Sequence, residues 1–170
     1  MTTDAMVLQL FEQSKTHIYG KYKGIVTEVE PATMRVKAIV KAVLGDTPTG
    51  WADPCVPFAG KEFGIAFLPQ VGSGVWIEFE GGNTSHPIWT GSYWYEGEYL
   101  PEVKENVQVI TTPAKQKIIF DGDNGKVEFS DENGNKVTID SSGITLERGS
   151  MKVVVSDTSV NVNSGALEVK

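Results

Sequence analysis

The sequence predicts an all-β protein: a small five-stranded barrel, followed by a ladder of very short strands that several chains must share. Two observations support this prediction. Apolar and polar residues alternate at every second position in many segments, which is typical of β-strands with one buried face. Gly, Asn, Asp, Ser and Pro interrupt these segments at short intervals, as expected for tight turns. Because the first part leaves no room for a crossover helix, its strands are expected to close on themselves.

Residues 1–18 form an N-terminal segment in which a short helix is predicted over 4–15. Thr3 or Asp4 is the expected N-cap, and apolar residues follow at helical spacing on one face. These apolar residues are Met6, Val7, Leu10 and Phe11. The face is equally suited to docking on the chain's own barrel or on a partner.

Residues 19–95 are predicted to form the barrel. Its five strands are expected at 23–30, 34–43, 63–68, 74–80 and 87–91. A connection rich in Gly and Pro spans 44–60 and contains Cys55, the single cysteine of the sequence. With one cysteine the chain has neither an intramolecular disulfide nor a cysteine-based zinc site. Since Cys55 lies in an apolar run, its thiol is predicted to be buried and unreactive.

Residues 96–116 are predicted to be a linker, because Pro101 and Pro113 disfavour regular strand pairing. The ladder, or spike domain, follows over 117–170. Seven segments in it each carry an apolar pair at positions i and i+2. The fourteen residues, predicted to form the core of a trimer, are Ile118, Phe120, Val127, Phe129, Val137, Ile139, Ile144, Leu146, Val153, Val155, Val160, Val162, Leu167 and Val169.

One copy of this ladder is predicted to be too small to stabilise itself. Burying its apolar pairs stabilises the fold less than ordering the backbone costs. A row of short strands also exposes polar edges that invite another chain. Association of three chains around one axis, with the apolar pairs inside and polar residues outside, removes both problems. Ile119 and Val154 are apolar exceptions on the predicted outer side.

Charge and composition exclude several classes of protein. The formal net charge is -7 and the sequence pI is about 4.8, which argues against a general binder of nucleic-acid backbones. Neither a signal peptide nor a stretch of transmembrane length is recognised. We therefore expect a soluble protein that is made in the cytoplasm.

Two motifs in the barrel region form a specific combination. The first is the turn Pro69-Gln-Val-Gly72-Ser-Gly74 within the run 63–82, and the second is Pro87-Ile-Trp-Thr-Gly91. Together with 19–26, 34–37 and 51–57, they resemble the OB-fold domain of phage baseplate spike proteins. That family comprises the central spike of contractile-tail phages, baseplate assembly protein V and the valine-glycine repeat proteins of type VI secretion. The order of barrel, linker and ladder extends the resemblance to the C-terminus.

The resemblance implies a five-stranded OB-fold barrel followed by a triple-stranded, intertwined β-helix. It implies a homotrimeric structural protein that has no enzymatic activity and that punctures the target cell envelope. Such a protein is made in the bacterial cytoplasm and is located in a virion baseplate or an injection particle. The implied partners are a separate hub protein and a tip cap of the proline-alanine-alanine-arginine repeat type. Neither cofactor, metal nor nucleic acid is expected. The sequence ends without the His-x-His motif with which some short spikes hold iron, and it lacks room for a lysozyme domain.

Two other functions compete with the spike. A nucleic-acid-binding OB domain would use exposed aromatic residues as stacking platforms together with basic side chains. The aromatic candidates are Trp51, Trp76, Trp89, Tyr93 and Trp94, and the basic residues are Lys21, Lys23, Arg35, Lys37 and Lys41. A glycan-degrading enzyme would use Glu78 and Glu80, about 7 Å apart on one strand face, although a solvated face explains them better. Asp121-Gly-Asp-Asn-Gly-Lys126 resembles a calcium loop, but Lys126 stands where that loop requires Gly. A hairpin turn is predicted there instead.

Overall fold

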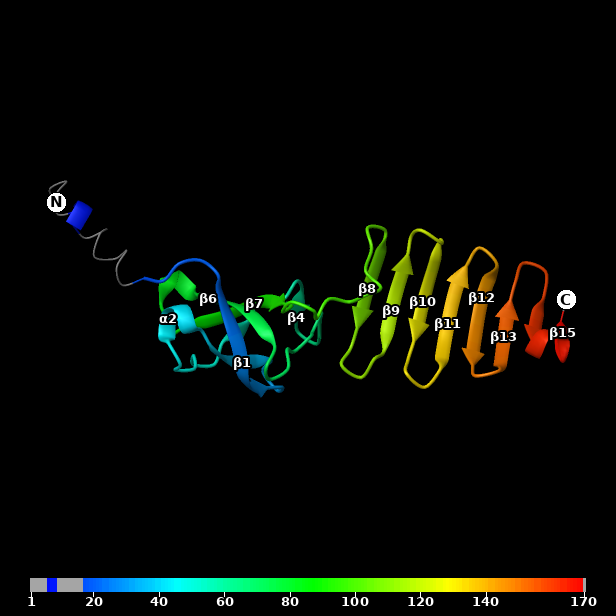
Figure 1. Cartoon of the computed structure of the whole chain (residues 1–170), viewed down its shortest axis with the longest axis horizontal. Helices are drawn as coiled ribbons and strands as arrows, with labels where there is room; N and C mark the ends of the chain where they lie inside the picture. Colours follow the sequence, from blue (N-terminus) through cyan, green and yellow to red (C-terminus); the bar gives the residue numbers. More distant parts are fainter. Residues whose placement is uncertain (1–5, 9–16, 170) are drawn as a thin grey trace. The chain divides into compact units, whose positions relative to one another are not determined.

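The computed structural model of the chain describes residues 6–8 and 17–169. It comprises two compact units, with the boundary between Tyr99 and Leu100 (Figure 1). We call them the proximal unit and the ladder unit. Strands dominate both, as predicted. Residues 6–8 are helical, and the remainder of the predicted helix over 4–15 lies outside the described residues.

The proximal unit is built on a five-stranded mixed sheet with the spatial order β2-β1-β6-β7-β3. The strands are β1 (Tyr22–Glu30), β2 (Arg35–Ile39), β3 (Asp53–Pro54), β6 (Gly74–Phe79) and β7 (Pro87–Tyr93). Only β3 runs parallel to its neighbour, β7, among the described strands of this sheet. An isolated bridge joins Val36 of β2 to Ala52, just before β3. The sheet is OB-like. The sequence predicted a closed five-stranded barrel, and the structure does not show that closure.

Two predicted strands of the barrel are corrected. The segment 34–43 leaves the sheet after Ile39, because α2 (Lys41–Leu44) forms a single helical turn. Its backbone is held by Leu44 N–H, which donates to the carbonyl of Val40 over 2.9 Å. The predicted strand 63–68 is reduced to β5 (Phe63–Gly64), which pairs with β4 (Ala59–Gly60) in a separate hairpin. The alternating apolar residues there remain exposed, so the strand pattern does not report a buried face.

The core of the proximal unit comes from alternate positions of the paired strands. Val75, Ile77 and Phe79 of β6 are buried, while Trp76 and Glu78 point the other way, as predicted. The buried cluster consists of Val26, Val36, Ala38, Val40, Ala52, Val75, Ile77, Phe79 and Trp89. After β6 the chain makes a 3₁₀ turn, η1 (Glu80–Gly82), before β7 begins.

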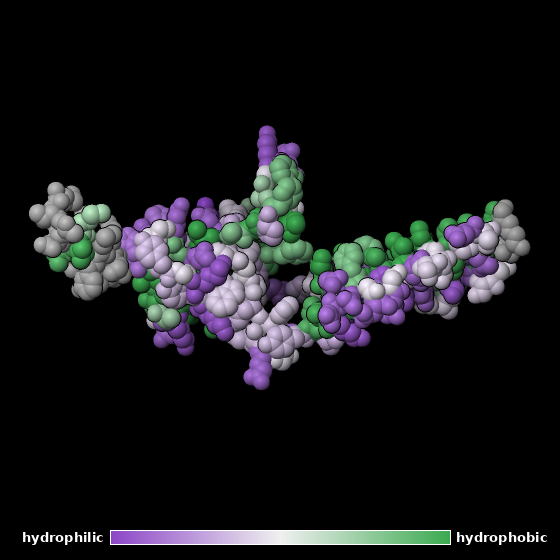
Figure 2. All heavy atoms as spheres, turned by 90° about the horizontal axis from the view of Figure 1, so that it is seen from above, coloured by the Kyte–Doolittle hydropathy of each residue, from purple (hydrophilic) through white to green (hydrophobic). Residues whose placement is uncertain are grey.

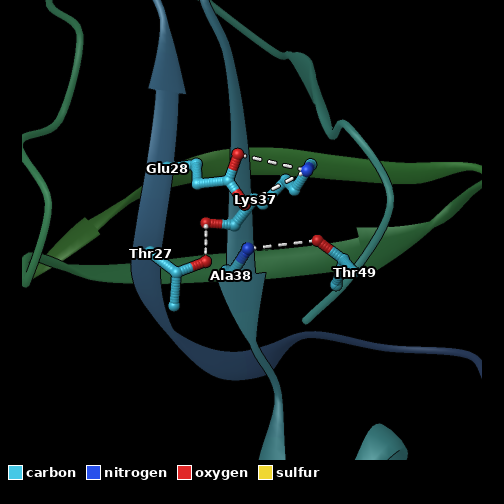
Figure 3. A network of polar contacts seen from close by, with 5 residues as sticks. All are labelled: Thr27, Glu28, Lys37, Ala38 and Thr49. Atoms are coloured by element: carbon cyan, nitrogen blue, oxygen red, sulfur yellow. Dashed lines mark hydrogen bonds and ion pairs between the residues drawn. The ribbon is translucent and has the colours of Figure 1, made fainter. Parts of the chain in front are cut away.

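A polar network fixes the hairpin of β1 and β2 (Figure 3). The register shifts between Val26 and Glu28, so Thr27 occupies a bulge, and its hydroxyl donates to the Lys37 carbonyl over 3.2 Å. Lys37 Nζ lies 3.1 Å from both carboxylate oxygens of Glu28. Thr49, a buried polar residue, accepts the Ala38 N–H at 3.1 Å. Side chains thus satisfy backbone groups at the bulge and along the outer edge of β2, which is an edge strand of this sheet.

Cys55 is exposed, so its predicted burial is wrong. Ala52 occupies the core, and strand alternation then turns Asp53 and Cys55 outward. The backbone N–H of Cys55 donates to the Trp89 carbonyl over 2.9 Å, which keeps this segment beside β7.

The ladder unit is one eight-stranded sheet in which consecutive strands pair antiparallel. The strands are β8 (Val107–Thr111), β9 (Lys117–Asp121), β10 (Lys126–Ser130), β11 (Asn135–Asp140), β12 (Gly143–Arg148), β13 (Met151–Val155), β14 (Val160–Val162) and β15 (Leu167–Val169). A 3₁₀ turn, η2 (Asn163–Gly165), joins the last two. All seven predicted apolar pairs lie in strands, in the predicted order.

The strand β8 lies inside the segment 96–116 that was predicted to be an unpaired linker. Pro101 and Pro113 flank this strand without interrupting it, so neither removes a donor from its ladder with β9.

The pairing also differs from the predicted intertwined β-helix. Both edges of every strand from β9 to β14 are bonded to sequence neighbours of the same chain. One chain therefore forms a meander sheet by itself, because turns of two to five residues bring successive strands together. Among the described residues, no helix has the length and apolarity needed to cross a membrane.

Candidate functional site

The register of the ladder gathers all fourteen predicted core residues on one face of the sheet. Directly paired residues in an antiparallel sheet project from the same face, and the pairs form two continuous rows from β9 to β15. The first row is Ile118, Phe129, Val137, Leu146, Val153, Val162 and Leu167. The second row is Phe120, Val127, Ile139, Ile144, Val155, Val160 and Val169. We call this surface the apolar face.

The strand that sequence reasoning missed extends both rows. Ile110 of β8 pairs with Ile118 and continues the first row, and Gln108 pairs with Phe120 at the end of the second. The apolar residues Val107, Val109 and Ile110 of β8 were the available signal, and the two flanking prolines obscured it.

The apolar face is uncovered in the single chain. Phe120, Phe129 and Leu146 remain 44%, 42% and 48% exposed, whereas Ile77 in the proximal core is 0% exposed. Figure 2 shows hydrophobic residues along one side of the ladder and hydrophilic residues along the other. A contiguous exposed apolar surface of this kind marks an interaction site.

The opposite face of the ladder carries polar residues and ion pairs. Lys126 Nζ lies 3.3 Å from Glu128, and Lys136 Nζ lies 3.8 Å from Glu147. One of the two apolar exceptions is now explained. Ile119 pairs with Val109 at the end of this face where Val107 is buried and where Lys117 forms an ion pair with Glu102 from the preceding segment.

Aspartates hold the turns between the ladder strands. Asp121 accepts hydrogen bonds from both the backbone and the side-chain nitrogen of Asn124, at 3.0 and 2.9 Å. The side-chain bond from Asn124 lowers the pKa of Asp121, and the corresponding bond from Asn135 lowers the pKa of Asp131. The segment 122–125 is the turn between β9 and β10, as the hairpin prediction required. No cluster of potential metal ligands is found among the described residues.

The basic residues considered for nucleic-acid binding are engaged within the proximal unit. Four of the five form ion pairs with carboxylates: Lys21 with Glu78, Arg35 with Asp53, Lys37 with Glu28 and Lys41 with Asp46. The fifth, Lys23, lies over the Tyr93 ring at 4.9 Å. Trp89, considered as a stacking platform, is buried and donates its indole N–H to the Met34 carbonyl. These contacts engage the five basic residues within the unit and remove Trp89 as a stacking platform, whereas Trp94 remains 55% exposed.

The carboxylates considered for glycan cleavage do not form a matched pair. β6 ends at Phe79, so Glu80 lies in η1 while Glu78 lies in the strand. Both line a shallow groove of about 750 Å³ with His86. The Glu78 carboxylate is 3.0 Å from Lys21 Nζ, and this ion pair gives it a structural role.

The motif residues of the proximal unit shape the approach to β6 and β7. Gly72 has φ +89° and its N–H donates to the Val26 carbonyl over 2.8 Å, which ties the turn after Pro69 to β1. Gly74 allows the Tyr93 ring to pack on the backbone, since an added Cβ would lie 2.6 Å from that ring. Burial, then the neighbouring Tyr95 hydroxyl, raise the pKa of Tyr93 to about 12. Pro87 begins β7, and Gly91 lies near its bulge opposite β6.

Two protein-family models match the chain, and each corresponds to one unit. The model described as the type VI secretion system/phage-baseplate injector OB domain matches residues 22–94, which contain the whole five-stranded sheet. The model described as the phage baseplate V C-terminal trimerisation domain matches residues 107–168, from the start of β8 into β15. The chain belongs to the phage baseplate V family. No curated protein matches it.

Membership identifies the role of each unit in general terms. The proximal unit is an injector OB domain, and the ladder unit is a trimerisation domain. Baseplate V proteins are structural and typically non-enzymatic components of a phage baseplate or a type VI secretion apparatus. The resemblance stated from the sequence motifs is thereby confirmed.

Proposed function

We propose that this baseplate V protein forms the homotrimeric central spike of a contractile tail or a related injection machine, without enzymatic activity. The observation that supports this proposal most strongly is the uncovered apolar face. Sixteen positions from β8 to β15 form its two rows, and all but Gln108 are apolar. Inside a trimerisation domain, the natural cover for such a face is the same face of two further copies.

Three copies arranged around a common axis would form a three-sided prism. Each copy would turn its apolar face toward the axis and its polar face toward water, and the fourteen residues predicted from the sequence would form the shared core. Because strands within each chain already satisfy one another, the copies would be held mainly by side-chain packing across the axis. A narrow shaft without free edges along its length suits a rigid needle.

The proposed mechanism is mechanical. Sheath contraction drives the needle through the target cell envelope, while the OB domains couple it to a separate hub protein. A tip-capping protein of the proline-alanine-alanine-arginine repeat type would cover the free edge of β15. The ion-paired surface of the proximal unit is compatible with protein partners and gives no support to nucleic-acid binding.

The stoichiometry is tested by placing one charge on either face of the same strand. Val137→Asp puts a carboxylate in the first apolar row, whereas Thr138→Asp puts it on the polar face one residue away. Light scattering coupled to gel filtration should give three chain masses for the wild type and for Thr138→Asp. Val137→Asp should dissociate or aggregate, because an unpaired carboxylate in a shared core is strongly unfavourable.

A stable wild-type monomer would refute the proposal. So would a Val137→Asp variant that assembles as well as its Thr138→Asp control.

A further inference from the structure

The turns of the ladder lie along two opposite margins of the sheet. Since the chain reverses at every turn, alternate turns project from opposite sides (Figure 1). One margin holds the turns 122–125, 141–142 and 156–159. The other holds the turns 112–116, 131–134 and 149–150. The charged residues in these turns, or within two residues of them, differ systematically between the margins.

The first margin, here called the acidic margin, carries four aspartates and one lysine between residues 117 and 159. In order along the ladder they are Asp121, Asp123, Lys126, Asp140 and Asp157. None of these aspartates makes an ion pair within the part of the chain that the structure describes. Their charge is therefore available to a neighbouring molecule.

The second margin, here called the basic margin, carries five cations and three carboxylates over 112–152. In the same order they are Lys115, Lys117, Asp131, Glu132, Lys136, Glu147, Arg148 and Lys152. Three of the lysines are paired with carboxylates of their own chain. Arg148 and Lys152 make no ion pair among the described residues, and both are exposed.

A ring of three identical copies joins unlike margins. Contacts in a cyclic assembly are heterologous, so each corner of the prism brings the acidic margin of one copy beside the basic margin of the next. Rotation about an axis parallel to the ladder produces no shift along it. Residues at the same level of the ladder must therefore meet at each corner.

Level by level, the charges that meet are opposite. From β9 to β14 the meeting groups are Asp121 and Asp123 with Lys115 and Lys117, Lys126 with Asp131 and Glu132, Asp140 with Lys136, and Asp157 with Lys152. At the level of β12, Glu147 and Arg148 meet the uncharged turn 141–142. The second level is the most informative, because both margins reverse sign there together. An excess of charge on each margin would not by itself produce that reversal.

The pattern also rejects a displaced assembly. If one copy slid by a single strand, Lys126 would face the lysines of an adjacent level, and an acidic residue would face Asp131 and Glu132. The two apolar rows are nearly uniform along the ladder and oppose such sliding only weakly. Charge patterning of this kind discriminates against wrong registers more than it adds affinity.

We propose that ion pairs between unlike margins lock the three copies side by side at one axial level, with Lys152 of one copy pairing with Asp157 of the next. This inference rests on the proposed trimer and assigns its lateral contacts. Lys152 is the second residue of β13, and Asp157 lies in the turn between β13 and β14. Both side chains are exposed in the single chain.

A charge-reversal cycle on the full chain tests the pairing. Lys152→Asp and Asp157→Lys should each lower the melting temperature of the trimer by about 4–8 °C, because each places like charges at all three corners. The double variant should lose less than the sum of the two single losses. Thr145→Asp, which adds a carboxylate to the neighbouring strand β12 on the polar face, is the matched control and should melt like the wild type.

Cross-linking then distinguishes failure of this inference from failure of the trimer. In a Cys55→Ser background, Lys152→Cys with Asp157→Cys should give a covalently closed trimer with a short bismaleimide. Thr145→Cys with Asp157→Cys should give little product between chains. Wild-type protein of three chain masses without the cross-link, or single reversals no different from Thr145→Asp, would overturn the corner pairing alone. A monomeric wild type would overturn the proposed function with it.

Discussion

In the proximal unit nine apolar side chains lie buried in one cluster, whereas Val107 is the single buried apolar side chain among the described residues of the ladder unit. Both units use the same alternation of apolar and polar residues. In the proximal unit, the connection that contains Ala52 and the helical turn α2 packs against the sheet, so alternate residues acquire a cover. In the ladder unit the sheet remains a single layer, and its apolar face has no cover within the described part of the chain.

The comparison teaches that alternation alone specifies a strand with two different faces and leaves the cover undefined. A cover within the chain gives a stability that does not depend on protein concentration. A cover from other copies makes stability depend on concentration, because folding and assembly are then one equilibrium. The two units of one chain should therefore respond differently to equivalent substitutions.

The largest effect is expected from cavities made in each unit. Ile77→Ala should destabilise the proximal unit by about 2–5 kcal/mol, since Ile77 is fully buried in its core. Leu146→Ala should lower the stability of the ladder by removing contacts that form only in the assembly. Calorimetry over a range of protein concentrations checks both expectations. In the Leu146 variant, the transition of the ladder unit should have a midpoint that depends on protein concentration. In the Ile77 variant, the transition of the proximal unit should have a midpoint that does not. Equal behaviour would break the comparison.

A smaller effect is expected at the buried polar residue of the proximal unit. Thr49→Val keeps the shape of the side chain but leaves the Ala38 N–H without its acceptor (Figure 3). The expected loss is about 1–3 kcal/mol, the cost of an unsatisfied buried donor. Chemical denaturation monitored by tryptophan fluorescence measures it, and Thr47→Val, at an exposed position, is the control. No loss at Thr49 would show that the hydroxyl contributes nothing.

The smallest effect concerns the pH dependence of the ladder. Hydrogen bonds, first from the Asn135 side chain, lower the pKa of Asp131. A carboxylate with a lowered pKa in the folded state stabilises the fold above its unfolded pKa of about 3.9, and that stabilisation is lost as the pH falls through the folded value. When the pH is lowered below about 4, the melting temperature of Asp131→Asn should therefore fall less than that of the wild type. An unchanged acid slope would contradict this role.

Most of the ladder could be predicted because its local signals agree with one another. Each apolar pair, from Ile118 and Phe120 to Leu167 and Val169, is bounded by residues that favour turns, so both the strand and its end are specified locally. The face shared by these pairs follows from the two-residue period. Pairing partners are less local. The hairpin turn predicted at 121–126 implied pairing within the chain at that point, whereas the family resemblance implied intertwined chains, and the structure pairs all the inner strands within the chain.

The wrong predictions in the proximal unit concern segments whose apolar residues follow a strand pattern but are exposed in the structure. Phe63, Ile65 and Phe67 alternate like a core strand, yet all three are exposed in the structure. Cys55 lies in an apolar run at the edge of the sheet, where alternation turns it outward. The motif residues Pro69 and Gly72 were easier to place, because a turn imposes steric demands that few residue types meet. Their roles as family markers remain predictions.

Because each ladder strand bonds only to the strands before and after it, the length of the ladder is set by the number of hairpins. Duplicating one hairpin would add about 9–10 Å, two spacings between strands, while two apolar rows would keep the width unchanged. In the proposed needle, length and thickness would therefore vary independently. Needles of other lengths would arise by gain or loss of hairpins, provided that the proposed alternation of charge along the two margins is preserved.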